Sequence, residues 1–165
     1  MQNAHMSAQL RALHGAVLDI VSFMNRPQND EALIREANIP LDRALFPLLV
    51  AIDRFGPIGV VDLADRIGRD YTTVSRQIAR LESLGLAERR QNPVDRRLRE
   101  AVITSKGKAM TNAVDAARDR MGRAIFARWD AREMDELVRL VRKFANALQR
   151  EQSERFAVMS RRHWP

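Results

Sequence analysis

Apolar residues recur at three- and four-residue steps through most of the chain, which is the period of amphipathic helices. The spacing predicts a first helix from about Leu10 to Asn25. Further helices are expected near residues 29–37, 42–55, 60–67, 72–84, 105–129 and 131–150. Pro47 lies inside one of these segments. We expect it to kink that helix or to delay its start, because proline lacks a backbone N–H.

Polar residues with short side chains stand before several of these helices, where they can accept hydrogen bonds from free backbone amides. Gly68 and Gly85 follow the last apolar residues of two helices, where glycine commonly ends a helix. In chain order, the expected caps are Asn29 or Asp30, Thr72 or Thr73, Thr104 or Ser105, and Asp130 with Glu133 as a capping box.

One stretch departs from the helical period. Two short apolar runs, Leu86-Ala87 and Leu98 to Ile103, flank the turn-rich loop Gln91 to Asp95. Apolar runs around such a loop predict a β-hairpin. The expected fold class is therefore mainly α-helical with a small β-hairpin.

The segment before the hairpin has the pattern of a helix-turn-helix. Such a motif needs a small residue where its helices cross, and Ala64 supplies it. Gly68 can adopt the positive φ of the tight turn, and Val74 provides an apolar contact from the second helix. Because this spacing also arises by chance in helical proteins, the motif needs support from the surface of the second helix.

Polar and basic residues are concentrated on the second helix. Hydroxyl groups and a helix N-terminus can bind phosphates, while arginine and glutamine can read guanine and adenine edges in the major groove. The alternative is an ordinary solvated helix face. The candidate DNA contacts are Tyr71, Thr72, Thr73, Ser75, Arg76, Gln77 and Arg80.

The positive charge of the chain is clustered. The net charge is +7 over 165 residues, yet the segment 66–99 holds nine arginines against four acids and so carries +5. Asp95, Arg96 and Arg97 lie at the expected hairpin tip, where extended arginines can enter a minor groove and Asp95 can hold one of them. The alternative is a solvated loop. A hairpin beside a helix-turn-helix predicts a winged helix-turn-helix that binds duplex DNA.

Other compositional features restrict the class of protein. The chain has no cysteine, which excludes disulfides and thiol chemistry. His5, His14 and His163 are widely separated, and no phosphate-loop or nucleophile motif occurs, so we expect neither a metal, a cofactor nor an enzyme. No apolar run suits a membrane span or a signal peptide, and we expect a cytoplasmic protein without a membrane partner.

Residues from about Leu45 to Gly107 resemble the MarR family of transcriptional regulators. The flanking helices also fit, so the resemblance extends over about residues 8–148. Two departures are Gly59, where the family often has a serine or threonine cap, and Pro47, within a helix that lines the family's effector pocket. The residues that carry the resemblance are Gly56-Pro57, Leu63-Ala64, Thr73-Val74-Ser75-Arg76, Leu81-Glu82, Gly85-Leu86 and Asp95-Arg96-Arg97 running on to Ile103-Thr104-Ser105-Lys106-Gly107.

The resemblance implies a homodimer that recognises a palindromic duplex. It places Thr73, Ser75, Arg76 and Gln77 on the recognition helix, and Asp95 and Arg97 on the wing with Arg96 beside them. The implied domains are N-terminal dimerisation helices (8–40), the winged helix-turn-helix (41–104) and C-terminal dimerisation helices (105–150). Residues 1–7 include Ala-His-Met and are expected to be a disordered start or cloning remnant, and residues 151–165 are expected to form a tail.

A small aromatic or anionic effector is typical of the family. Phe23, Phe46, Arg54 and Phe55 can line a crevice for it, or they can be core and rim residues. We therefore expect a sequence-specific repressor released by such a ligand. The alternative is a non-specific basic helical module, or a DNA-architectural one, without effector control.

Overall fold

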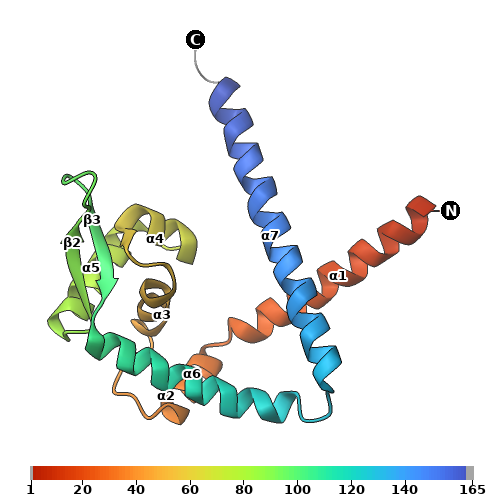
Figure 1. Ribbon diagram of the computed structural model, residues 1–165, viewed down its shortest axis with the longest axis horizontal. Helices are drawn as coiled ribbons and strands as arrows, with labels where there is room; N and C mark the ends of the chain where they lie inside the picture. Colours follow the sequence, from red (N-terminus) through yellow and green to blue (C-terminus); the bar gives the residue numbers. More distant parts are fainter. Residues whose placement is uncertain (1, 163–165) are drawn as a thin grey trace. The chain divides into compact units, whose positions relative to one another are not determined.

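The computed structural model describes residues 2–162 and confirms a mainly α-helical fold with a small antiparallel sheet (Figure 1). The chain forms two compact units, residues 1–121 and 122–165, and α6 runs from the first into the second. The helices are α1 (Gln2–Met24), α2 (Pro27–Glu36), α3 (Phe46–Phe55), α4 (Val60–Ile67), α5 (Tyr71–Ser83), α6 (Ser105–Ile125) and α7 (Ala131–Arg162). The strands are β1 (Ile58–Gly59), β2 (Ala87–Gln91) and β3 (Arg99–Ile103).

The predicted hairpin is confirmed and forms part of a three-stranded sheet. The strand order is β1-β3-β2, and both pairings are antiparallel. Ala87 pairs with Ile103 and Gln91 with Arg99 along the hairpin, while Ile58 pairs with Ala101. The sequence did not predict β1, because a two-residue strand shows no alternating pattern.

The hydrophobic core lies beneath the sheet and between α3, α4 and α5, and α6 adds Val114 and Ala117 to it. Each helix buries one face and gives the core fully enclosed aliphatic side chains, as expected for a protein poor in aromatic residues. The most deeply buried side chains are Leu48, Leu49, Ile52, Leu63, Val74, Ile78, Leu81, Leu86 and Val114. The three helices cluster around the sheet, and α6 leads away from it (Figure 1).

Two helices begin at positions other than those predicted. The α2 helix starts at Pro27 and not at an Asn29 or Asp30 cap, because proline fits the first helical turn, where its missing N–H costs no hydrogen bond. The α3 helix starts at Phe46 and not near Asp42, so Pro47 delays the helix and does not kink it. Asp42 instead closes a turn, in which its carboxylate accepts a hydrogen bond from the Ala44 N–H at 2.6 Å.

The long helices also differ in length from the prediction. The α1 helix begins at Gln2 and so includes residues 2–7, in a segment that has no glycine or proline before Gly15. The α6 helix ends at Ile125, before the predicted limit of Trp129. The α7 helix continues through residues 151–162 of the expected tail, while residues 163–165, including His163, lie outside the described part of the chain. Across residues 2–162, no helix combines the length and apolarity needed to span a membrane.

Candidate nucleic-acid interface

The helix-turn-helix consists of α4, a tight turn and α5. Gly68 has a φ of 64°, as its position in the predicted turn requires, and the Arg69 N–H donates to the Ala64 carbonyl at 3.0 Å. Ala64 is 4% exposed and Val74 is fully buried. The three residues that suggested the motif therefore occupy the expected helix crossing, turn and contact.

The N-terminus of α5 is capped by Asp70, and the prediction of Thr72 or Thr73 as the cap was wrong. The Asp70 carboxylate accepts a hydrogen bond from the Thr73 N–H at 2.8 Å. Hydrogen bonds from the Thr73 side chain and backbone lower the pKa of Asp70, and the charge of Arg76 adds to this effect. Thr72 and Thr73 lie inside α5, which begins at Tyr71, so neither occupies the cap position.

The outward face of α5 is a polar stripe that repeats with the helical period. Four predicted contacts lie on it, and Ala79 was not predicted because its side chain has no polar group. Thr73, Ser75 and Gln77 lie beside the stripe and are partly buried. The exposed residues are Tyr71, Thr72, Arg76, Ala79, Arg80 and Ser83.

One edge of α5 is joined to the hairpin by Arg89 of β2. The Arg89 guanidinium donates to the Ser75 carbonyl at 2.9 Å and contacts Ser75 Oγ at 3.4 Å. Its backbone N–H donates to the Glu82 carboxylate at 3.0 Å, and its Nη1 lies 3.4 Å from the other oxygen. The hydroxyl of Ser75 therefore faces a guanidinium of the same protein.

The other edge of α5 is joined to the connection between α2 and α3. Gln77 Nε2 donates to the Ala44 carbonyl at 3.1 Å. Arg69 Nη1 donates to the same carbonyl at 3.2 Å and to Gln77 Oε1 at 3.0 Å. Sequence reasoning did not find these links, because the partners are 25 and 33 residues apart and one is a backbone carbonyl.

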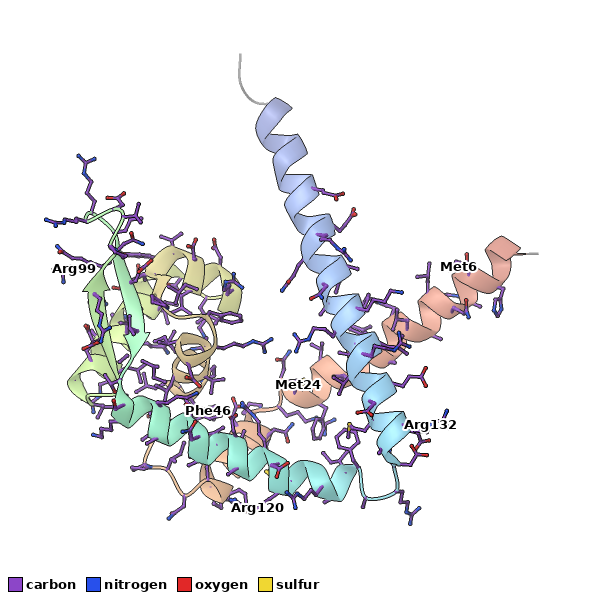
Figure 2. All side chains as sticks on the ribbon, in the orientation of Figure 1. Met6, Met24, Phe46, Arg99, Arg120 and Arg132 are labelled. Carbon is purple, nitrogen blue, oxygen red and sulfur yellow. The ribbon has the colours of Figure 1, made fainter. Side chains whose placement is uncertain are left out.

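The hairpin tip, or wing, is a loop closed by Asn92 and Asp95. Asn92 Oδ1 accepts hydrogen bonds from the N–H groups of Val94 and Asp95, both at 2.8 Å. Asp95 Oδ1 accepts a hydrogen bond from the Arg97 N–H at 3.0 Å. Asp95 therefore holds an arginine of the wing, as predicted, but through the backbone of that residue. Arg96 and Arg97 are exposed, and Figure 2 shows side chains projecting outward around this tip, near Arg99.

The four candidate effector residues have different environments. Phe46 is 3% exposed and belongs to the core (Figure 2), whereas Phe23 is 53% exposed on α1. The partly buried ring of Phe55 has the guanidinium groups of Arg54 and Arg66 at 5.3 and 4.6 Å from its centroid. Arg54 and Phe55 are thus the members of the set that the structure shows in contact.

The arrangement defines a DNA-binding winged helix-turn-helix, and the comparisons identify its family. The model for the MarR family matches residues 41–98. The HTH-type transcriptional regulator YxaD of Bacillus subtilis is 32% identical over 130 residues, which span 78% of this chain and 90% of that protein. The chain belongs to the MarR family of transcriptional regulators.

Solved structures share the fold. A crystal structure of MarR superimposes with a TM-score of 0.65 at 24% identity and covers 85% of this chain and 93% of its own. A MarR family protein from Bacillus stearothermophilus gives a TM-score of 0.70 at 17% identity, with coverage of 87% and 97%. At these identities the similarity establishes the winged helix-turn-helix architecture.

Replacing Asp70 tests the cap of α5. Asp70→Ala is expected to lower the midpoint of thermal unfolding because the Thr73 N–H loses its acceptor, whereas Asp70→Asn retains an acceptor and most of the stability. The lowered pKa means that the charged carboxylate stabilises the fold above its ordinary pKa of 3.8 and that this contribution is lost as the pH falls through the lowered value. The difference between wild type and Asp70→Asn should therefore be present at pH 6 and absent in strong acid.

Thr72→Ala serves as the control for this experiment, since Thr72 is exposed in the first turn of α5 and does not cap it. Equal midpoints for wild type and Asp70→Ala across this pH range would show that Asp70 does not stabilise the helix.

Proposed function

We propose that the protein is a homodimeric repressor that binds palindromic duplex sites, with α5 in the major groove and the wing beside it. The observation that carries the proposal is the exposed stripe of α5. Within residues 71–83, all of which the structure describes, Glu82 is the one acid, and it is paired with Arg89. The stripe therefore presents hydroxyls and guanidinium groups without a carboxylate that would repel phosphates.

The chemistry of the stripe suits direct readout. Arg76 and Arg80 lie about one helical turn apart on the exposed face, and a guanidinium can bind guanine O6 and N7 with two hydrogen bonds. Tyr71, Thr72 and the partly buried Thr73 surround the N-terminus of the helix, where hydroxyls can bind phosphates. We infer that these residues make the major-groove contacts.

The wing suits an adjacent minor groove. Asn92 and Asp95 fix the backbone of the loop, so Arg96 and Arg97 extend from a defined support. Arginine inserted into a narrow minor groove is favoured by the strong negative potential there. We infer that Asp95 contributes by holding the backbone of Arg97 in the wing.

Exposed apolar side chains support a dimer. The proposed dimerisation segments, residues 8–40 and 105–150, contain helices with apolar residues that a single chain leaves in water. A second copy of the chain can cover them, and two-fold symmetry would place two α5 helices about 34 Å apart, one turn of duplex. The exposed apolar residues of these helices are Leu10, Leu13, Leu18, Ile20, Val21, Phe23, Met24, Met121, Ile125, Val138, Leu140, Val141, Phe144 and Leu148.

We also propose that a small aromatic anion releases the DNA, with Arg54 and Phe55 as its contacts. Two guanidinium groups beside one partly buried ring can bind a carboxylate and an aromatic ring together. Salicylate is the probe: it should release the wild-type complex, and Arg54→Gln should need roughly tenfold more because a charge-assisted hydrogen bond is lost. Equal release from both proteins would exclude Arg54 as a contact.

The DNA contacts are tested with a site selected from random duplexes, compared with random duplex at two salt concentrations. Arg76→Ala should weaken specific binding by about 1–3 kcal/mol and relax the preference at the base pair that Arg76 reads. Arg97→Ala should weaken binding through the wing. Arg118→Ala is the charge-matched control, because Arg118 pairs with Asp115 on α6.

The same measurements separate the two candidate functions. A regulator prefers its selected site over random duplex by a large factor, whereas a non-specific basic module binds both alike. Wild-type affinity for Arg76→Ala would remove Arg76 from the contact set, and the same outcome for Arg97→Ala would show that the wing does not contribute.

The dimer is tested by introducing a charge on the apolar face of α7. Val141 is 55% exposed, and Val141→Glu should shift the protein to a monomer in sedimentation experiments because a carboxylate would be buried without a partner. Arg139→Glu adds the same side chain on the opposite side of the helix and should leave the dimer intact. A wild-type protein that sediments as a monomer would contradict the dimer.

A further inference from the structure

Two neighbouring segments, the α4–α5 turn and α5, bind the carbonyl of Ala44, which is distant from both in the sequence. Arg69 from the α4–α5 turn donates to it at 3.2 Å, and Gln77 from α5 donates to it at 3.1 Å. Arg69 also donates to Gln77 Oε1 at 3.0 Å, which closes a ring of three hydrogen bonds. Arg69 and Gln77 are partly buried and Ala44 is exposed, so the bond between the two side chains is the more shielded part of the ring.

This ring occupies the groups with which glutamine would read DNA. Glutamine recognises adenine by donating from its amide nitrogen and accepting at its amide oxygen. In this protein Gln77 Nε2 is bonded to Ala44 and Gln77 Oε1 to Arg69. Base reading would require breaking both bonds and leaving the Ala44 carbonyl and the Arg69 guanidinium with fewer partners.

We propose that Gln77 and Arg69 are positioning residues that fix the recognition helix to the α2–α3 connection, and that neither contacts DNA. The inference rests on the proposed function of α5 as the recognition helix. It assigns Gln77 a role different from that of Arg76, its neighbour in the sequence. Arg76 is exposed on the stripe, whereas Gln77 holds the edge of the helix in place.

Because Ala44 lies between α2 and α3, its hydrogen bonds to Arg69 and Gln77 connect this part of the chain to α5. Ala44 lies in the connection that leaves α2 and enters α3, next to the turn that Asp42 closes. The charge of Arg69 also acts on Asp30 of α2, whose pKa is raised by burial and lowered in part by nearby arginines. A displacement of the α2–α3 connection would therefore act directly on the hydrogen bonds that hold the edge of α5.

The first test uses the selected duplex site and all of its single base-pair variants. Gln77→Met keeps the length of the side chain and removes its hydrogen bonds. We expect affinity to fall by a similar factor, roughly three- to tenfold, for every duplex, with the order of base preferences unchanged. Arg69→Met should have the same effect and leave the salt dependence within half an ion of wild type, unlike a lost phosphate contact.

The double variant tests whether the two residues act together. Gln77→Met combined with Arg69→Met should bind no more than twofold more weakly than the weaker single variant, because either change breaks the ring. A lost preference at one base pair in Gln77→Met would overturn the proposal. So would a salt dependence lowered by a full ion per protomer in Arg69→Met, or penalties that add in the double variant.

The second test needs no DNA. Amide hydrogen exchange at residues 41–45 should rise roughly three- to tenfold in both single variants of the free protein and stay at the wild-type rate in Arg76→Ala, the neighbouring control. Unchanged exchange in both variants would overturn the link. If wild type binds all duplexes alike, the proposed function fails, while the exchange rates still decide whether Gln77 and Arg69 hold the helix.

Discussion

The inner face of α5 is buried completely, and the orientation of the exposed stripe depends on that burial. Val74, Ile78 and Leu81 leave no area exposed to water. Enclosing each such side chain contributes about 1.5–3 kcal/mol, more than an exposed polar contact can oppose. Because the three residues lie three or four apart, their burial fixes the rotation of the helix about its axis. The opposite residues, including Arg76 and Arg80, must then face outward.

The positive charge of the segment 66–99 has two distinct uses. Some arginines are engaged within the protein and hold elements together, while others extend from exposed positions. Net charge therefore indicates an anionic partner, but it does not identify the residues that contact it. The arginines that join different elements are Arg66 over the aromatic ring of Phe55, Arg69 on the Ala44 carbonyl and Gln77, and Arg89 on Ser75 and Glu82. Arg90 pairs with Glu88 of the same strand, and Arg80 of the exposed stripe donates to Ser83 of the same helix.

Local signals in the sequence predicted the local features of the fold. Gly68 marked the turn and Asp130 with Glu133 formed the expected capping box, because each depends on residues within a few positions. The prediction of the α5 cap failed because two neighbouring residues, Asp70 and Thr72, both have side chains that can cap a helix. The links to Ser75 and Gln77 could not be predicted, because their partners, Arg89 and the Ala44 carbonyl, come near only after folding.

The C-terminal end of α5 is also joined to the element that follows the wing. Thr104 Oγ1 donates to the Gly85 carbonyl at 2.7 Å and accepts a hydrogen bond from the Gly107 N–H at 3.0 Å. Lys106 Nζ donates to the Leu84 carbonyl at 2.9 Å. Gly107 allows this approach, because a Cβ there would lie 2.1 Å from the Leu86 carbonyl oxygen.

The first turn of α6 is thus fixed to the end of α5, just as the α2–α3 connection is fixed to its edge through Ala44. These links restrain α5 at its edge and at its C-terminal end, so we expect the helix to move together with both supports. In the proposed dimer, a change in the angle between protomers would then alter the separation of the two α5 helices and leave the contacts within each protomer intact.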